Sequence, residues 1–269
     1  MKTTIFLSGM LLLFCTFPLS GQTPQTTFQV TAGVSPYLVF DQAASPFVYR
    51  TNLYQAGFQF RREGAKQVWD LSLRGGFGSS KSMGTGHREI RFMGRDIHGV
   101  TDTFDVVVGG QLLRGTLEAG WAYRLSPSLA VGLRAGDELY YAQGFVYPGL
   151  MNLAYLAPQL DYARTLGEKH RVSARVAVPV LALINRPSYH GSVSLPETGQ
   201  AGGFFRQNFS VNTVNRFQRA SLELAYQYRI SGRISLGLGY SAFFMHHDDL
   251  STLRALDQSL MASLTFHSR

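Results

Sequence analysis

A strict alternation of side-chain character over residues 111–125 constrains the fold more than any other feature of the chain. From Leu113 to Leu125, one set of alternate positions is apolar or small, whereas the other set includes Arg114, Glu118 and Arg124. This period of two is typical of a β-strand and not of a helix. The run is more than twice as long as an ordinary strand of about five or six residues. It therefore predicts one long strand whose two faces meet different environments.

The same alternation recurs along the chain and predicts ten strands. One face of each strand is apolar, and the opposite face carries charged or small residues. So many charged faces cannot all be half-buried in one dry core, because an unpaired buried charge is costly. The pattern favours a closed barrel with its charged face inside. The predicted strands are about 27–40, 48–62, 66–79, 104–125, 129–144, 151–165, 169–184, 214–230, 233–247 and 254–267.

The connections between these segments alternate in length. Short turn signals lie at 63–65, 126–128, 166–168 and 231–232. The longest connections are 80–103 and 185–213. Short turns at one rim and longer loops at the other are typical of transmembrane barrels. We predict an all-β, antiparallel up-and-down transmembrane barrel of about ten strands, with eight or twelve as alternatives, and with both termini on the short-turn, periplasmic side.

The N-terminal residues 1–21 are predicted to be a secretory signal peptide that precedes a barrel domain of residues 22–269. Lys2 supplies the positive start, and an apolar run of residues 5–17 follows. That run is too short for a membrane helix, which requires about 20 residues. Cleavage after it would remove Cys15, the single cysteine. An exported chain without apolar helices can still span a membrane as a closed barrel.

The last predicted strand resembles the C-terminal signal strand of the outer-membrane β-barrel proteins of Gram-negative bacteria. Residues 258–266 alternate and end on the aromatic Phe266, although His267, Ser268 and Arg269 follow it. The resemblance implies an integral location in the outer membrane. It also implies contact with outer-membrane lipid and lipopolysaccharide, and recognition by the outer-membrane insertion machinery.

Alternation also predicts where individual side chains point. Ten strands leave an interior only slightly wider than that of an eight-strand barrel, which its side chains fill. Inward charges should therefore pair across a plugged or very narrow lumen. The predicted inward charges are Asp70, Arg74, Arg114, Glu118, Arg134, Glu138, Asp161, Arg171, Arg175, Arg219 and Glu223. The predicted aromatic girdle, at the membrane interfaces, is Trp69, Trp121, Tyr123, Tyr226, Tyr228, Tyr140 and Phe244.

These features favour a non-enzymatic barrel that serves envelope structure, binding or narrow transport of small anions. The alternative is a surface hydrolase. His246, His247, Asp248 and Asp249 end a predicted strand at the loop rim, and the ten-stranded outer-membrane proteases of the omptin family have Asp and His residues at the barrel mouth. The stretch from His190 to Ser192 resembles the His-x-Ser element of outer-membrane lipid hydrolases, but Val193 stands where lipid A deacylases have Asn.

The composition argues against several other functions. The formal net charge is +8, and 21 of the 25 basic residues are arginines. Because many of these arginines should lie inside the barrel, the charge does not indicate nucleic-acid binding. No cofactor is predicted, and no metal site either, because the adjacent His246 and His247 should point to opposite faces of a strand. The sequence leaves the oligomeric state open.

Overall fold

The computed structural model describes the chain over residues 25–42, 47–83, 89–95, 101–107, 109–143, 150–186, 209–249 and 251–268. Every element in these ranges is a β-strand. None of the described residues forms a helix long and apolar enough to cross a membrane. The strands are β1 (Gln25–Asp41), β2 (Val48–Glu63), β3 (Gln67–Ser82), β4 (Glu89–Arg95), β5 (Thr101–Val107), β6 (Gly109–Arg124), β7 (Leu129–Gln143), β8 (Leu150–Leu166), β9 (His170–Ala177), β10 (Leu181–Asn185), β11 (Phe209–Thr213), β12 (Phe217–Arg229), β13 (Ile234–Asp249) and β14 (Ser251–Ser268).

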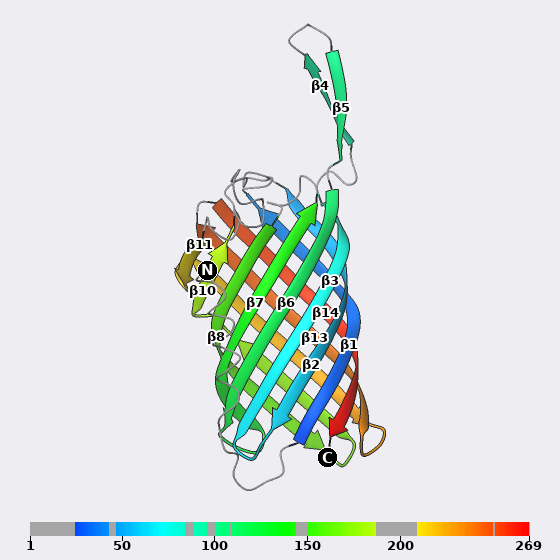
Figure 1. Cartoon of the computed structure of the whole chain (residues 1–269), viewed down its shortest axis with the longest axis vertical. Coiled ribbons are helices and arrows are strands. Elements are labelled where there is room, and N and C mark those ends of the chain that lie inside the picture. Colours follow the sequence, from blue (N-terminus) through cyan, green and yellow to red (C-terminus); the bar gives the residue numbers. More distant parts are fainter. Residues whose placement is uncertain are drawn as a thin grey trace, which may run out of the picture.

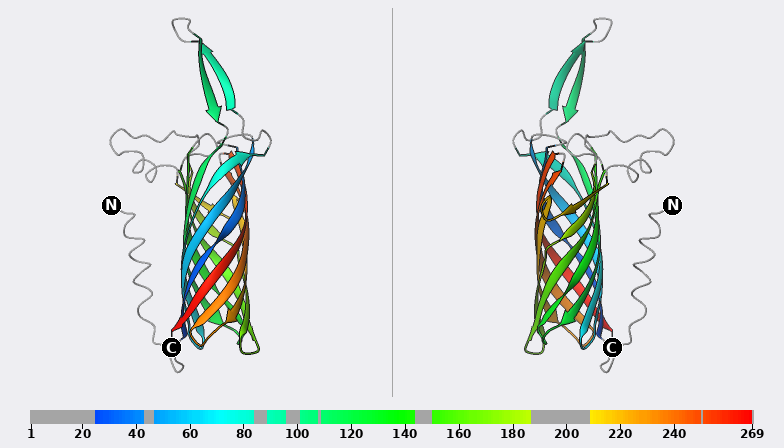
Figure 2. Two further views of the ribbon diagram at one scale, coloured as in Figure 1. Left: turned by 90° about the vertical axis from the view of Figure 1, so that its right-hand side faces the viewer. Right: turned by 90° about the vertical axis from the view of Figure 1, so that its left-hand side faces the viewer.

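Twelve of these strands form one closed antiparallel barrel (Figures 1 and 2). The first strand, β1, pairs with both β2 and β14, and the additional pairing of β8 with β9 completes the ring. Two positions in the ring are each shared by a pair of strands, β9 with β10 and β11 with β12, so the barrel has ten strand positions. The predicted ten-strand antiparallel barrel is therefore confirmed.

A proline explains why β9 and β10 are separate. Pro179 has no backbone N–H and cannot donate to a strand ladder. The flanking residues keep their bonds to β8, because the Val178 amide donates to the Pro158 carbonyl at 3.3 Å and the Val180 amide to the Leu156 carbonyl at 2.9 Å. The strand position predicted over 169–184 is thus continuous in space although it is interrupted in hydrogen bonding.

Four short connections join strands at one rim of the barrel. They cover residues 64–66, 125–128, 167–169 and 230–233. Gly167 has a φ of 66°, a left-handed conformation that favours glycine, which suits the three-residue turn between β8 and β9. The two ends of the described chain meet at this same rim, where Thr26 pairs with Ser268. We call it the short-turn rim and the opposite one the loop rim.

One strand differs from its prediction. The segment predicted as a single strand over 104–125 is two strands: β6 begins at Gly109, and β5 pairs instead with β4 in a separate hairpin beyond the loop rim (Figure 1). The predicted loop 80–103 therefore contains a strand. Ile90 and Phe92 stand in register with Val106 and Phe104, and β-branched and aromatic residues of this kind favour strand pairing.

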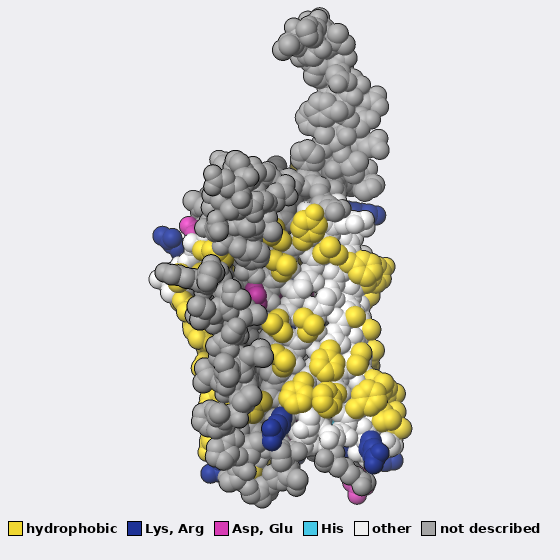
Figure 3. Space-filling model, in the orientation of Figure 1, with side chains coloured by type: hydrophobic (Ala, Val, Ile, Leu, Met, Phe, Trp, Pro, Cys, Tyr) yellow, Lys and Arg dark blue, Asp and Glu magenta, His cyan; other side chains and the backbone are white. Residues whose placement is uncertain are grey.

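The outer wall of the barrel is apolar and its charged side chains lie inside. On β6, Leu113 is 50% and Leu117 41% exposed, whereas the intervening Thr116 and the following Glu118 are buried. Hydrophobic side chains are spread over the visible wall in Figure 3, and basic side chains lie near its two ends. This is the reverse of a sheet packed on a dry core, and it suits a wall that faces lipid.

Most of the predicted girdle residues point outward. Near the short-turn rim, the rings of Trp69 and Trp121 lie 6.2 Å apart, and Tyr123, Tyr226 and Tyr228 are exposed. Towards the loop rim, Phe244 is exposed.

Tyr140 is a correction to this prediction. It is only 5% exposed and lies inside the barrel, where its hydroxyl donates to Glu138. It shares the parity of Glu138, and two residues along a strand bring a side chain back to the same face. Its neighbour Tyr141, 42% exposed, takes the outward position instead.

An arginine on the outer wall should destabilise the barrel according to its depth. Leu117→Arg places a charge midway along β6, whereas Leu125→Arg places it just beyond the strand, at the short-turn rim. We expect losses of about 2–4 kcal/mol for the first and about 0–1 kcal/mol for the second. Denaturant titration in phospholipid vesicles measures both. Equal losses would contradict a lipid-facing wall.

Candidate functional site

Apolar side chains fill the half of the interior nearest the loop rim. Tyr37, Leu53, Leu112, Phe217 and Met245 come from five different strands, and each is almost completely buried. The Tyr37 ring stacks on that of Tyr140 with centroids 6.1 Å apart. Buried polar residues such as Asn185 and Asn212, and the Arg186–Asp41 ion pair, lie at the same end. This part of the lumen is a packed core of mainly apolar side chains.

Two arginines lie directly beneath this apolar core. Arg114 pairs with Glu138 at 3.2 Å and also with Asp257, while Arg219 pairs with Glu138 at 2.5 Å. The guanidinium carbons lie 4.8 and 4.3 Å from the centroid of the Phe243 ring. Each charge thus has a carboxylate partner and an aromatic face, two contacts that compensate for its removal from water.

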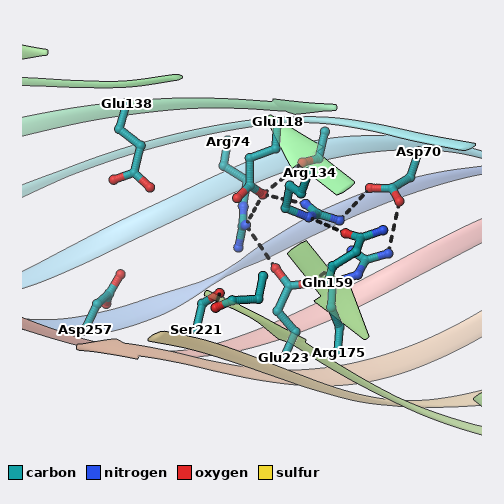
Figure 4. Close-up of polar contacts among 12 residues, drawn as sticks. Asp70, Arg74, Glu118, Arg134, Glu138, Gln159, Arg175, Ser221, Glu223 and Asp257 are labelled. Carbon is teal, nitrogen blue, oxygen red and sulfur yellow. Dashed lines mark hydrogen bonds and ion pairs between the residues drawn. The ribbon is translucent and has the colours of Figure 1, made fainter. Parts of the chain in front are cut away.

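A denser group of charges occupies the middle of the barrel (Figure 4). Arg134, from β7, pairs with Asp70 at 2.7 Å and with Glu118 at 3.0 Å. It also donates to the Gln159 amide oxygen at 3.0 Å. Arg175, from β9, pairs with Asp70 at 3.0 Å. One arginine therefore binds acceptors from three strands at once.

Of the remaining central pairs, one connects opposite sides of the ring and three join neighbouring strands. Arg74 of β3 pairs with Glu118 at 2.8 Å and with Glu223 of β12 at 3.2 Å. Arg175 also pairs with Asp161 at 2.6 Å and with Glu223 at 3.2 Å. We call the charged residues of these central pairs the charge ladder. They are Asp70, Arg74, Arg114, Glu118, Arg134, Glu138, Asp161, Arg175, Arg219, Glu223 and Asp257. Its pairs run across the lumen as well as between neighbouring strands.

Glycine makes room for one member of this network. A Cβ atom on Gly136 would lie 2.3 Å from the Tyr155 ring. Without it, Tyr155 reaches across and donates its hydroxyl to Glu118 at 2.6 Å. A small residue is therefore required at position 136, whose side chain would point into the barrel.

All eleven predicted inward charges form at least one ion pair inside the barrel. Sequence reasoning missed several of their partners, for which alternation from a neighbouring predicted residue was the available signal. The missed partners are Glu63, Tyr155, Gln159 and Asp257.

The interior near the short-turn rim is more open. A polar cavity there is lined by Gln29, Gln59, Arg171, Gln227 and His267 among others. His267 accepts or donates a hydrogen bond with Ser235 at 2.8 Å at this rim. Smaller spaces also lie among the central charges, lined by residues such as Arg74, Arg134 and Arg175. The described lumen is thus packed towards the loop rim and cross-linked by charges in the middle, with a polar cavity towards the short-turn rim.

The structure does not assemble the predicted hydrolase residues of the loop rim. His247 is buried, 3% exposed, and packs edge-on against Phe217. Asp248 accepts a hydrogen bond from Thr252 at 3.3 Å, and Asp249 pairs with Arg216 at 3.5 Å. Among the described residues of this rim, neither nitrogen of the His247 ring has a hydrogen-bond partner.

The remaining candidates are His246, His190 and Ser192. His246 is half-buried on β13, next to His247. No group of three or more His, Cys, Asp or Glu residues in the described part of the chain could hold a metal ion. His190 and Ser192 lie outside the described residues, and so does the predicted signal peptide of residues 1–21.

Comparisons with known proteins find similarity in structure but not in sequence. No protein-family model matches the chain, and no curated protein matches it. Among solved structures, the outer-membrane protease OmpT of Escherichia coli is 8% identical, with a TM-score of 0.49 over 94% of this chain and 99% of its own. The toluene transporter TodX of Pseudomonas putida is 10% identical, with a TM-score of 0.28 over 93% and 91%. Ail, the attachment invasion locus protein of Yersinia pestis, is 8% identical, with a TM-score of 0.29 over 91% and 100%.

The comparisons therefore show no family, and the architecture is stated from the geometry of the chain. The described sheet closes on itself, its outer wall is apolar, its charged residues lie inside, and four short turns lie at one rim. Closed sheets of this kind can satisfy their backbone groups within lipid. The described part of the protein is a closed antiparallel β-barrel with ten strand positions.

Proposed function

We propose that the protein is an integral outer-membrane barrel with a plugged lumen, which serves envelope structure or binding and not free diffusion of solutes. The observation that carries this proposal is the set of ion pairs that cross the lumen. Arg74 and Glu223 come from β3 and β12, on opposite sides of the ring. Arg114 of β6 reaches Asp257 of β14 in the same way.

Opening such a lumen would be costly. Glu138 and Arg219 are almost fully buried, and separating a buried pair leaves an uncompensated charge that costs about 3–5 kcal/mol. The buried apolar core between the ladder and the loop rim would be a second barrier to a solute moving along the lumen. Both barriers support a static plug in place of an open pore.

The proposed orientation follows from the two rims. In outer-membrane barrels short turns face the periplasm and longer connections face outward. The loops predicted over 80–103 and 185–213 would then present the binding surface outside the cell, although residues 187–208 lie outside the described residues. The apolar wall would contact outer-membrane lipid and lipopolysaccharide. We also propose that the outer-membrane insertion machinery recognises β14, whose Phe266 is exposed on the outer wall.

A plugged lumen predicts the absence of conductance. The refolded protein, inserted in a planar lipid bilayer, should give no stepwise currents, because packed apolar side chains and paired charges leave no continuous water path. Insertion is verified in parallel by resistance of the barrel to protease in vesicles of the same lipid. Regular conductance steps from inserted protein would overturn the plug and favour narrow anion transport.

Removing one hub of the charge ladder should strongly destabilise the barrel. Glu118 accepts hydrogen bonds from Arg74, Arg134 and Tyr155. We expect Glu118→Ala to lower the free energy of unfolding by about 3–5 kcal/mol, because it leaves buried arginines with fewer partners.

The matched control is Glu168→Ala, in the exposed turn between β8 and β9, which should change stability by less than about 0.5 kcal/mol. Denaturant titration compares the two variants. Similar small losses would show that the ladder does not hold the barrel.

A further inference from the structure

Three arginines converge on one carboxylate at the short-turn end of the lumen. Glu63 pairs with Arg61 at 2.8 Å, with Arg171 at 2.6 Å and with Arg124 at 2.5 Å. Arg61 and Glu63 belong to β2, Arg124 to β6 and Arg171 to β9. Side chains from three separate positions in the ring thus meet at one point. We call these four residues the arginine cluster.

The arginine cluster is not electrically balanced. One glutamate faces three arginines, which leaves a surplus of two positive charges. Asp70 stands opposite Arg61 in the register of β2 and β3, but its own ion pairs are with Arg134 and Arg175. The ion pairs nearer the loop rim, those of Arg114 and Arg219, are matched by Glu138 and Asp257. The central arginines Arg74, Arg134 and Arg175 meet four carboxylates, so the cluster together with this central group carries one net positive charge.

The arginines of the cluster are also accessible, more so than Arg114, Arg134, Arg175 and Arg219 of the charge ladder. The side chains of Arg61, Arg124 and Arg171 keep 21%, 27% and 28% of their surface exposed. Arg61, Glu63 and Arg171 line the polar cavity of the short-turn end. A solute entering that cavity would meet guanidinium groups whose single carboxylate partner is shared three ways.

We propose that the arginine cluster is a binding site for a phosphate-bearing solute that enters from the short-turn, periplasmic side. Guanidinium groups bind phosphate oxygens through paired, charge-assisted hydrogen bonds. A phosphate group offers three strong acceptor oxygens, one for each of the three arginines. A carboxylate offers only two. The site lies below the plug, so it is separate from the structural or surface-binding role proposed above.

In this site Glu63 would compete with the ligand for the arginines. Its two carboxylate oxygens are shared by all three guanidinium groups. A phosphate would take over donors from Glu63 and would be repelled by its charge. Removing that charge should therefore tighten phosphate binding, whereas removing an arginine should weaken it.

The experiment is a calorimetric titration of inorganic phosphate into the full-length protein in a neutral maltoside detergent at pH 7.5. Phosphate should bind, and acetate should bind at least about tenfold more weakly. Arg61→Gln and Arg171→Gln should each weaken phosphate binding by about tenfold, the effect of losing one charge-assisted hydrogen bond. No measurable binding of phosphate, or equal binding of acetate, would overturn the proposal.

Arg62→Gln is the matched control. Arg62 is the exposed neighbour of Arg61 and points to the opposite face of β2, so the substitution removes the same charge outside the lumen. Its phosphate affinity should stay unchanged. A loss equal to that of Arg61→Gln would show only general attraction to a basic rim. If an arginine variant does not fold, Glu63→Gln decides: tighter binding supports the site, and unchanged or weaker binding overturns it.

Lipid headgroups carry the same phosphate chemistry, and a second arm separates the two sources. The titration is repeated in nanodiscs of phosphatidylcholine and of phosphatidylglycerol. Because the cluster faces the lumen, phosphate should bind with the same affinity in both. Competition by phosphatidylglycerol would assign the site to a lipid headgroup and overturn the assignment to a solute.

Discussion

The hydrogen-bonded closure between β1 and β14 is the constraint on which the rest of the structure depends. Lipid offers no partners for backbone amides and carbonyls, so a spanning sheet must leave no free edge. Fourteen residues of β1 are in register with β14, and β8 pairs with β9 to complete the ring. Closure then fixes two environments, and alternation along each strand sends every second side chain to lipid and the others into the lumen.

A ring of ten strand positions encloses a space that long side chains can bridge. The interior uses this property, because its charges come from well-separated strands and meet near the barrel axis. Arg175 contacts carboxylates from β3, β8 and β12. Such pairs are weak evidence for added stability, since desolvation offsets much of their attraction. They do fix the distances between opposite walls, and so they define one shape for the barrel.

The barrel could be predicted from the sequence because a period of two is a local property. Tyr140 was misplaced although a local signal was available, since it shares the parity of Glu138 two residues away. Pairing across the lumen depends on distant parts of the chain: the partner of Arg114 in β14, Asp257, is 143 residues away in sequence, so no local pattern could pair them. The hairpin β4–β5 was missed because the strand was extended back to 104, although the alternation is regular only from 111 and Gly109–Gly110 is a break signal.

The inner residues change in character along the barrel axis, and this change gives the two ends different chemistry. Apolar side chains fill the loop-rim half, paired charges occupy the middle, and a surplus of arginine lies at the short-turn end. A pore for diffusion would need a continuous polar path between both ends, and the apolar core interrupts it. If the proposed plug holds, the polar cavity below the ladder is open only to the short-turn rim. The proposed phosphate site would then exchange its ligand with that side alone.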